Sequence, residues 1–276
     1  MLKNGLYIVA TPIGNLNDIT LRALDVLKNA DVIACEDTRV SKKLFTLLGI
    51  STDKKFICYE DHREDKVASK IVEMIESGLS VALISDAGSP LISDPGYKLV
   101  KLCRAQNLSV TTIPGASAVI SALQISGLPT NRFMFAGFIP NKQKARADLF
   151  SELKNINATL VFYETAPRLT DTLNAMSEPF EGREIAVARE ITKIYEECRT
   201  GTAQELCTYY KETPPKGEIV LMIAPPNAND TQVDIASELQ KRLKTMSVKD
   251  AVQEVSLLSG AKKSDVYDLA LRLKNE

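Results

Sequence analysis

The sequence predicts an α/β protein with two consecutive α/β domains and a small helical tail. Short apolar runs alternate with segments of helical spacing, which is typical of a doubly wound, largely parallel sheet. A turn signal, Gly127-Leu-Pro-Thr-Asn, is followed by a second set of such segments. Beyond a break at Pro225-Pro-Asn-Ala-Asn-Asp, the spacing is helical only. We therefore expect domains at 1–126, 127–229 and 230–276.

The first domain is expected to contain five strands with helices between them. Each predicted strand is short and apolar, and a polar or glycine-rich turn follows it. Asp18 or Thr20 is placed to cap the first helix. The expected strands are 6–11, 30–35, 55–59, 79–85 and 108–113, and the expected helices are 20–28, 40–48, 65–77, 96–104 and 116–126.

The second domain and the tail follow from the same signals. The expected strands are 133–138, 159–163, 184–188 and 218–224, with helices at 142–154, 167–176 and 203–210. In the tail, Ser247 is a plausible helix cap, Gly260 a helix stop, and Ser264-Asp265 the opening of a final helix. This spacing resembles a helix-turn-helix, with Lys262 and Lys263 at the head of its second helix.

Composition indicates a globular protein without a membrane span. The chain is 45% hydrophobic and 25% charged, with a formal net charge of −1, so no overall basic field marks a nucleic-acid partner. Five cysteines lack metal-site spacing, which indicates reduced thiols. No signal peptide is evident, and no apolar run approaches the ~20 residues of a spanning helix. We expect a cytoplasmic protein with no membrane partner.

Common catalytic and nucleotide-binding motifs are absent from the sequence. It contains no GxGxxG, GxxxxGK[ST], GxSxG or HExxH pattern, which disfavours dinucleotide, P-loop, serine-hydrolase and zinc-protease sites. His62 is the only histidine, and we interpret it as a solvated loop residue. A metal would have to rely on carboxylates alone, so no metal site is expected.

Residues 84–96, read as ISDAGSPLISDPG, form the strongest candidate loop. Two acids, two glycines, two prolines and three serines lie between a buried strand and a helix. A plain connector in which Ser93 or Asp94 caps the helix is the alternative. Similar polar loops end nearly every predicted strand, and ligands bind beyond such ends in open α/β sheets. A cleft between the domains would suit a nucleoside-type cofactor.

Seven segments in order resemble the tetrapyrrole methylase superfamily and, within it, the branch that methylates small-subunit ribosomal RNA. The resemblance covers almost the whole chain. It implies methyl transfer from S-adenosylmethionine to the ribose 2′-hydroxyl of a cytidine in the decoding centre of 16S rRNA, within the small ribosomal subunit. It also implies a homodimer. The segments are GLYIVATPIGNLNDITLRAL (5–24), ACEDTR (34–39), ISDAGSPLISDPG (84–96), IPGASA (113–118), FAGFIP (135–140), LVFYETAPR (160–168) and AREITK (188–193).

The resemblance further implies two α/β domains of the tetrapyrrole methylase type, with the cofactor cleft between them. Many relatives that modify tetrapyrroles have Asp where this chain has Ser89, so the ribose contact can come from Asp86 or Asp94 instead. The cofactor-binding residues carried over are Pro12, Gly88, Ser89, Ile92, Ser117, Ala118, Tyr163, Ile191 and Pro225, together with Asp86 and Asp94.

Charged residues within the matched motifs are expected on the methyl-acceptor side. A ribose hydroxyl is a poor nucleophile, so a base or a neighbouring cation should assist it. Asp37, Glu164, Glu190 and Lys193 are the catalytic candidates, with no order of preference. RNA contacts are expected at Arg39 and Arg168, whose guanidinium groups match phosphates, and at Lys142, Lys144, Arg146, Lys262 and Lys263.

Two other functions remain open on the sequence alone. One is methylation of a small tetrapyrrole intermediate in the same cleft. The other is a catalytically inactive relative that binds RNA or a nucleoside. The segments CEDTR (35–39) and FYETAPR (162–168) and the helical tail favour the rRNA enzyme, because they have no obvious role in the first alternative. Polar groups at so many strand ends disfavour the second.

Overall fold

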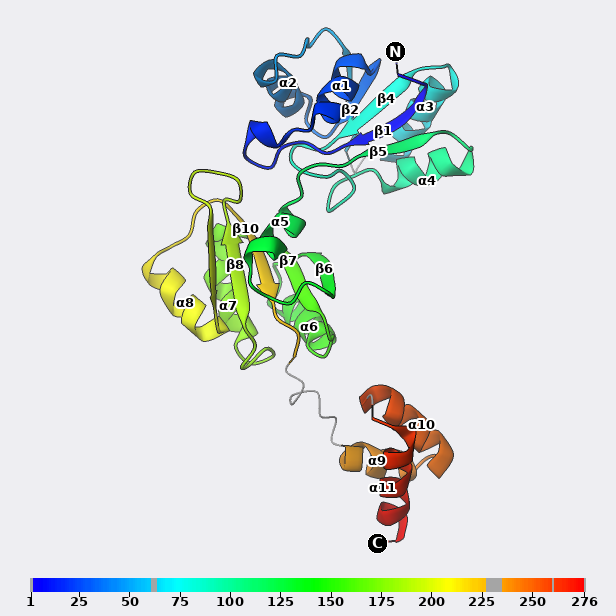
Figure 1. The fold of residues 1–276 in the computed structure, drawn as a ribbon, viewed down its shortest axis with the longest axis vertical. Coiled ribbons are helices and arrows are strands. Elements are labelled where there is room, and N and C mark those ends of the chain that lie inside the picture. The colour runs from blue at the N-terminus through cyan, green and yellow to red at the C-terminus, as the bar shows by residue number, and fades with distance from the viewer. Residues whose placement is uncertain (1, 61–63, 227–234, 260, 276) are drawn as a thin grey trace.

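The chain folds into two lobes, each built on a five-stranded sheet, and a C-terminal bundle of helices (Figure 1). The computed structural model describes residues 2–60, 64–226, 235–259 and 261–275. The expectations for His62 and Gly260 fall outside these ranges. No helix within them is long and apolar enough to cross a bilayer.

The sheet of the first lobe is parallel throughout, as predicted. Its strand order is β3-β2-β4-β1-β5. Every residue of β2 and β4 is buried, because helices cover both faces of a parallel sheet, and this explains their continuous apolar sequence. The strands are β1 (Gly5–Val9), β2 (Val32–Cys35), β3 (Lys55–Cys58), β4 (Ser80–Ile84) and β5 (Val110–Ile113).

Four helices cover this sheet, two on each face. Helices α1 and α2 contribute Leu27 and Phe45 to one apolar cluster, and α3 and α4 contribute Ile71 and Leu99 to the other. Thr20, rather than Asp18, caps α1, since its Oγ1 accepts a hydrogen bond from the Ala23 amide at 3.1 Å. The helices are α1 (Leu21–Asn29), α2 (Thr38–Leu47), α3 (Glu64–Glu76) and α4 (Tyr97–Ala105).

The start of α4 contradicts the plain-connector alternative for residues 84–96. Gly96 is the N-cap residue, and neither Ser93 nor Asp94 caps the helix. The buried carboxylate of Glu64 in α3 takes that role instead. Its Oε1 accepts hydrogen bonds from the amides of Gly96 at 3.1 Å and Lys98 at 3.3 Å. Ser93 and Asp94 instead line the cavity described below.

The sheet of the second lobe is mixed. Its order is β6-β7-β10-β8-β9, and only β6 and β7 are parallel to each other. Strand β9 was not predicted, because Glu-Cys-Arg-Thr-Gly lacks an apolar pattern and forms an edge of the sheet. The strands are β6 (Phe133–Phe138), β7 (Thr159–Thr165), β8 (Ile185–Arg189), β9 (Glu197–Gly201) and β10 (Glu218–Ile223).

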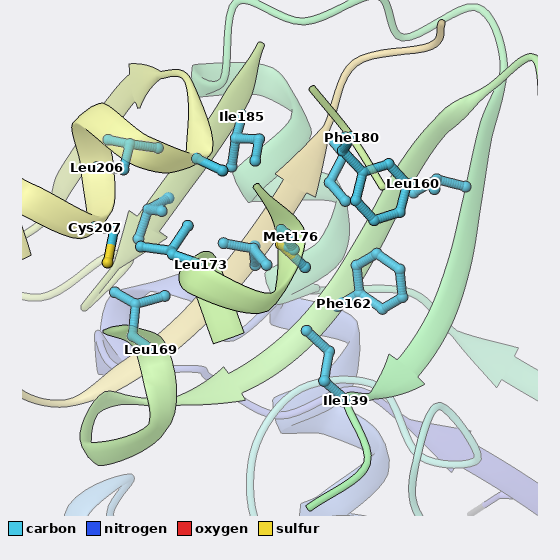
Figure 2. Close-up of a cluster of buried hydrophobic side chains, with 14 of the residues drawn as sticks. Ile139, Leu160, Phe162, Leu169, Leu173, Met176, Phe180, Ile185, Leu206 and Cys207 are labelled. Carbon is cyan, nitrogen blue, oxygen red and sulfur yellow. The ribbon is translucent and has the colours of Figure 1, made fainter. Parts of the chain in front are cut away.

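Different helices cover the two faces of this mixed sheet. Figure 2 shows the core on one face, where Phe162, Leu173 and Leu206 pack beneath helices α6 (Gln143–Leu153), α7 (Leu169–Met176) and α8 (Ala203–Glu212). On the other face, Val119 and Leu123 of α5 (Ala118–Ile125) pack against β7, β8 and β10. Helix α5 precedes the expected boundary at 126, yet its packing partners lie in the second sheet.

The tail forms a three-helix bundle with its own apolar core. Leu239, Val255 and Val266 are among the buried residues, one from each helix. Ser247 acts as expected, because its Oγ accepts a hydrogen bond from the Asp250 amide at 3.2 Å at the start of α10. The helices are α9 (Ile235–Leu243), α10 (Val248–Ser259) and α11 (Lys263–Asn275).

Candidate active site

A cavity of about 800 Å³ lies between the two lobes, at the carboxyl ends of the first sheet's strands. Its volume is within the range of small-molecule sites. The first lobe contributes Ile13, Glu36 and the loop 86–94, and α5 contributes Ser117 and Ala118. The second lobe contributes Phe138, the end of β7 with residues 163–167, Ile191, and residues 215–220 at the start of β10.

Main-chain contacts fix the loop 86–94 against the first strand. The Thr11 amide donates to the Gly88 carbonyl at 2.9 Å, and the Gly88 amide donates to the Thr11 carbonyl at 3.1 Å. Gly88 has a φ of +82°, which a side chain rarely adopts. Leu91 and Ser93 also have positive φ, and such strain in non-glycine residues clusters at functional sites.

The N-terminus of α5 forms part of the cavity wall. The Ser89 hydroxyl donates to the Ala116 carbonyl at 3.2 Å, which ties the loop 86–94 to the residues before α5. Ser117 caps the helix by accepting from the Ile120 amide. The positive end of the helix dipole therefore lies beside Ser117 and Ala118, where it favours an anionic group.

Tyr163 and Phe138 of the second lobe line the facing wall, and Phe135 packs against Tyr163. The Tyr163 ring lies 4.8 Å from that of Phe135 and 5.2 Å from that of Phe138, between ring centroids. Burial raises the pKa of the Tyr163 phenol, and the charge of Asp94 raises it further. Asp94 belongs to the first lobe, so this electrostatic effect acts across the cavity. Tyr163 stays protonated and offers an apolar face with a hydroxyl donor.

Asp86 and Asp37 lie together at one rim of the cavity but differ in their environment. The Asp37 amide donates to Asp86 Oδ1 at 3.3 Å. Burial raises the pKa of Asp86. By contrast, hydrogen bonds from Arg39 hold the pKa of Asp37 at about 2, and Arg39 Nη2 lies 2.7 Å from the Asp37 carboxylate. Asp37 and Arg39 are next to the wall residue Glu36 but do not themselves line the cavity.

On the second lobe, a lysine between two carboxylates lies near the wall residues Ile191 and Glu218. Lys193 Nζ lies 2.9 Å from Glu190 Oε1 and 2.8 Å from Glu218 Oε2. The bond to Lys193 lowers the pKa of Glu190. Burial lowers the pKa of Lys193, but the bonds to Glu218 and Glu190 outweigh it and leave that pKa raised. Lys193 is therefore a cation held in place by two ion pairs. One of its partners, Glu218, lines the cavity.

Comparison with protein-family models identifies two matches along the chain. Residues 5–207 match the tetrapyrrole (corrin/porphyrin) methylases. The chain belongs to the tetrapyrrole methylase family. Residues 230–274, which contain the three-helix bundle, match the RsmI C-terminal HTH domain. This second match covers the segment in which the sequence predicted a helix-turn-helix.

Similar proteins are found among both sequences and structures. The chain is 52% identical over 274 residues to ribosomal RNA small subunit methyltransferase I of Erythrobacter litoralis, covering 99% of this chain and 96% of that one. The protein of that name in Rickettsia prowazekii is 52% identical over 224 residues, 81% of this chain and 79% of that one. Uroporphyrin-III-C-methyltransferase of Thermus thermophilus superposes with a TM-score of 0.56 at 19% identity, covering 80% of this chain and 94% of that chain. At that identity, the similarity to the Thermus structure shows a shared fold only.

Within this tetrapyrrole methylase fold, Glu164 and Arg168 have structural roles. The Glu164 side chain is 0% exposed, although Glu164 is also one of the residues that line the cavity. It accepts hydrogen bonds from the Thr172 hydroxyl at 2.6 Å and the Thr165 amide at 2.7 Å, and Arg168 Nε lies 3.4 Å away. Arg168 also donates to the Ile139 carbonyl at 2.5 Å. Glu164 and Arg168 thus have partners inside the second lobe, and their roles as base and phosphate ligand stay predictions.

The pleat of β7 explains the surroundings of the Glu164 side chain. Side chains alternate across a strand, so Val161 and Tyr163 face α5 and the cavity, whereas Phe162 and Glu164 face α7. Tyr163 and Glu164 both line the cavity at the end of β7, but their side chains point to opposite faces of the sheet.

Pro225 is not where the resemblance implied. Strand β10 is antiparallel to β7, and Glu218 at its start pairs with Thr165 at the end of β7, beside the cavity. A strand rises by about 3.4 Å per residue, so Pro225, beyond the end of β10, lies far from the cavity. The expectation assumed that the last strand ends at the site, whereas it begins there.

The remaining predicted residues fall into three groups. Asp86, Gly88, Ser89, Ile92, Asp94, Ser117, Ala118, Tyr163 and Ile191 all line the cavity. Pro12 lies between Thr11 and the wall residue Ile13, and does not itself line the cavity. The cations outside the cavity wall are Arg39 on the rim, exposed Lys142 and Lys144 with half-buried Arg146 at the start of α6, and exposed Lys262 and Lys263 at the start of α11.

Several wall residues were missed by sequence reasoning. Glu36, Phe138, Lys216 and Glu218 all line the cavity. Glu36 and Phe138 lie inside the matched segments ACEDTR and FAGFIP. These segments could therefore have suggested both residues as candidates for the cavity wall. Lys216 and Glu218 belong to a Pro-Lys-Gly-Glu turn that carries no general motif, and only the antiparallel pairing of β10 brings them to the site.

Proposed function

We propose that this protein transfers a methyl group from S-adenosylmethionine to small-subunit ribosomal RNA, at the ribose 2′-hydroxyl of a cytidine in the decoding centre of 16S rRNA. The main support is a nucleoside-sized cavity between the lobes of a chain that is 52% identical, over 99% of its length, to a small-subunit rRNA methyltransferase. The fold likeness to a uroporphyrin methyltransferase, at 19% identity, does not favour a tetrapyrrole substrate.

The residues of the cavity suit S-adenosylmethionine. Gly88 lets main chain approach the ligand where a side chain would fill space, and Ser117 and Ala118 place a helix N-terminus for a carboxylate. Ile13, Ile92 and Tyr163 supply apolar surface for an adenine ring. Asp86 and Asp94 supply acceptors for ribose hydroxyls and for positive charge. When bound, this cofactor supplies a methyl group on a sulfonium centre.

Catalysis would then depend mainly on positioning and electrostatics. Methyl transfer is an in-line displacement, so a rigid wall that orients the acceptor hydroxyl accounts for much of the rate. The fixed cation of Lys193, held by Glu190 and Glu218, stabilises negative charge that develops on the acceptor oxygen. On the other rim, Asp37 stays ionised and Arg39 is available to a phosphate.

The proposal is tested by incubating the protein with labelled S-adenosylmethionine and either isolated small subunits or naked 16S rRNA. Nuclease mapping should place the label on the ribose of one cytidine. Label that appears only on a tetrapyrrole added in parallel would assign the protein to the small-molecule methylases. Cofactor binding without transfer to any acceptor would identify an inactive relative.

We propose that the tail docks onto ribosomal RNA. Lys262 and Lys263 are exposed at the start of α11, where the helix dipole adds to their positive charge. Truncation after Asn229, or Lys262→Glu with Lys263→Glu, should weaken binding to small subunits and leave cofactor affinity unchanged. Each lost phosphate contact should reduce the log–log salt slope by about one unit.

The control for the double charge reversal is Lys66→Glu with Lys70→Glu, an exposed pair on α3 of the first lobe. Filter binding across a salt series measures the slope of all three proteins. If Lys262→Glu with Lys263→Glu keeps the wild-type slope, the bundle contributes packing only.

We also propose that the protein is a cytoplasmic homodimer. Exposed apolar side chains gather on α5 and on β6, an edge strand of the second sheet, and burying them in a partner subunit would be favourable. They are Ile120, Ile125, Phe133 and Met134. Solution scattering at working concentration should give the mass of two chains, and the mass of one chain would contradict this proposal.

A further inference from the structure

Two loops at the rim of the cavity are locked to each other. One joins β8 to β9 (190–196), and the other leads into β10 (213–217). Lys193 of the first loop binds Glu218 directly after the second, at 2.8 Å. The Glu218 amide also donates to Glu190 Oε1 at 3.2 Å. Gly217 makes this close fit possible, because a Cβ at that position would collide with the Glu190 carboxylate.

The first of these loops is a closed, strained turn. The Lys193 amide donates to the Glu190 carbonyl at 3.0 Å, and the Glu196 amide donates to the Lys193 carbonyl at 3.1 Å. The Thr192 amide donates to Glu196 Oε2 at 2.6 Å. Glu190 and Thr192 both have positive φ. These hydrogen bonds hold the tip of the turn in one conformation. The two positive φ angles cost free energy, and such strained residues cluster at functional sites.

The two connected loops expose different kinds of side chain, apolar on one loop and cationic on the other. At the tip of the turn, Ile194 is 90% exposed and Tyr195 is 70% exposed. Lys216, on the other loop, lines the cavity and is exposed. Lys193 has two carboxylates as partners, whereas no ion pair to Lys216 is formed by the residues that the structure describes. An unneutralised cation thus stands in the cavity wall, and an apolar tip stands on the adjoining loop.

We infer that these loops hold the RNA strand that carries the methyl-acceptor nucleotide, with Tyr195 stacked on a nucleobase and Lys216 paired with a phosphate. The inference rests on the proposed function and specifies how that site holds its substrate. Proteins that bind single-stranded nucleic acid combine aromatic side chains, on which bases stack, with cations that follow the backbone. Both are present here, joined through Lys193, Glu190 and Glu218.

A second copy of the chain is the competing occupant of the tip. Such a contact would bury Ile194 and Tyr195, but it would leave Lys216 in the cavity wall without an opposite charge. A nucleic acid strand can do both, because its bases can cover the apolar tip and its phosphates can pair with Lys216. The rigid turn also suits stacking, because an ordered ring loses little conformational freedom when a base covers it.

Binding to naked 16S rRNA and to isolated small subunits tests the inference without requiring transfer. Tyr195→Ala should raise the Kd by about 5- to 150-fold, the range for loss of one stacked base. Tyr195→Phe should restore affinity, since the ring is retained. Lys216→Glu should reduce the log–log salt slope by about one unit, and Lys216→Arg should preserve it. S-adenosylmethionine affinity should be unchanged in Tyr195→Ala.

Matched controls separate these effects from general ones. Tyr97→Ala removes a ring that is 69% exposed on α4, and Lys70→Glu reverses an exposed charge on α3. Both should bind RNA as the wild type does. Wild-type RNA affinity in Tyr195→Ala and a wild-type slope in Lys216→Glu would overturn the inference. So would a halved mass in Tyr195→Ala with RNA affinity intact, which would assign the tip to a second copy.

The same measurements distinguish the inference from the proposed function. If the wild type binds rRNA through Tyr195 and Lys216 but methylates no nucleotide, the proposed function fails and the binding surface stands. If the wild type methylates rRNA while all four variants keep its Kd, KM and salt slope, the proposed function stands and the surface is refuted.

Discussion

Gly88→Leu and Ala118→Leu should each weaken S-adenosylmethionine binding by at least about tenfold, as expected for overfilling a packed wall or straining a special φ. Gly88 has a φ of +82°, and a Cβ there would lie 3.2 Å from Ile13 Cγ2 in the cavity wall. Ala118 begins α5 with ordinary helical geometry, so its variant tests volume without backbone strain. Isothermal titration calorimetry measures both affinities.

Gly78→Leu is the control for the backbone strain that a side chain introduces at a glycine with positive φ. Its φ is +100°, and nothing lies within 4 Å of a Cβ built there, so Gly78→Leu carries similar strain far from the cavity wall. It should lower the melting temperature and leave the affinity of the folded protein unchanged. Wild-type affinity in both Gly88→Leu and Ala118→Leu would move the cofactor out of this cavity.

Lys193→Met should lower kcat by about 10²- to 10³-fold, the usual effect of losing one group that stabilises charge in the transition state. Cofactor affinity should remain within about twofold, because Lys193 is not among the residues that line the cavity and the proposed function places it on the acceptor side. Since the pKa of Lys193 is raised, its charge persists at alkaline pH and the wild-type rate should not fall there through its titration. Single-turnover transfer to small subunits gives the rate.

Lys98→Met is the matched control, because Lys98 also lies between two carboxylates, 3.0 Å from Asp65 and 3.7 Å from Glu64. It should retain the wild-type rate. Asp37→Asn and Glu190→Gln should show the same selective loss of turnover as Lys193→Met, to a smaller degree. Full activity in these three rim variants would place the acceptor elsewhere.

Local sequence patterns predicted most elements because burial dominates their composition. The all-apolar runs at β2 and β4 indicate strands covered on both faces, and they are the centre of the first sheet. Strand β9 escaped notice because its position at the edge, beside β8, imposes no apolar pattern. Caps were predictable where a side chain supplies them, as at Thr20, and not at α4, where Glu64 comes from another helix.

The candidate site was predictable only as far as neighbouring residues along the chain determine it. The loop 86–94 and the residues Ser117 and Ala118 were found because glycine and small polar residues follow buried strands. Pro225 was misplaced because its position depends on the direction of β10. Pairing between strands far apart in sequence decides that direction, and it also brings Lys216 into the cavity wall.

The connection between β5 and α5 joins the two lobes, and its own residues form part of the cavity wall. The chain passes from the first sheet to the second through residues 114–117, where the Ala116 carbonyl anchors Ser89 and Ser117 borders the cavity. A ligand that touches both walls would therefore also contact the segment that joins the two lobes.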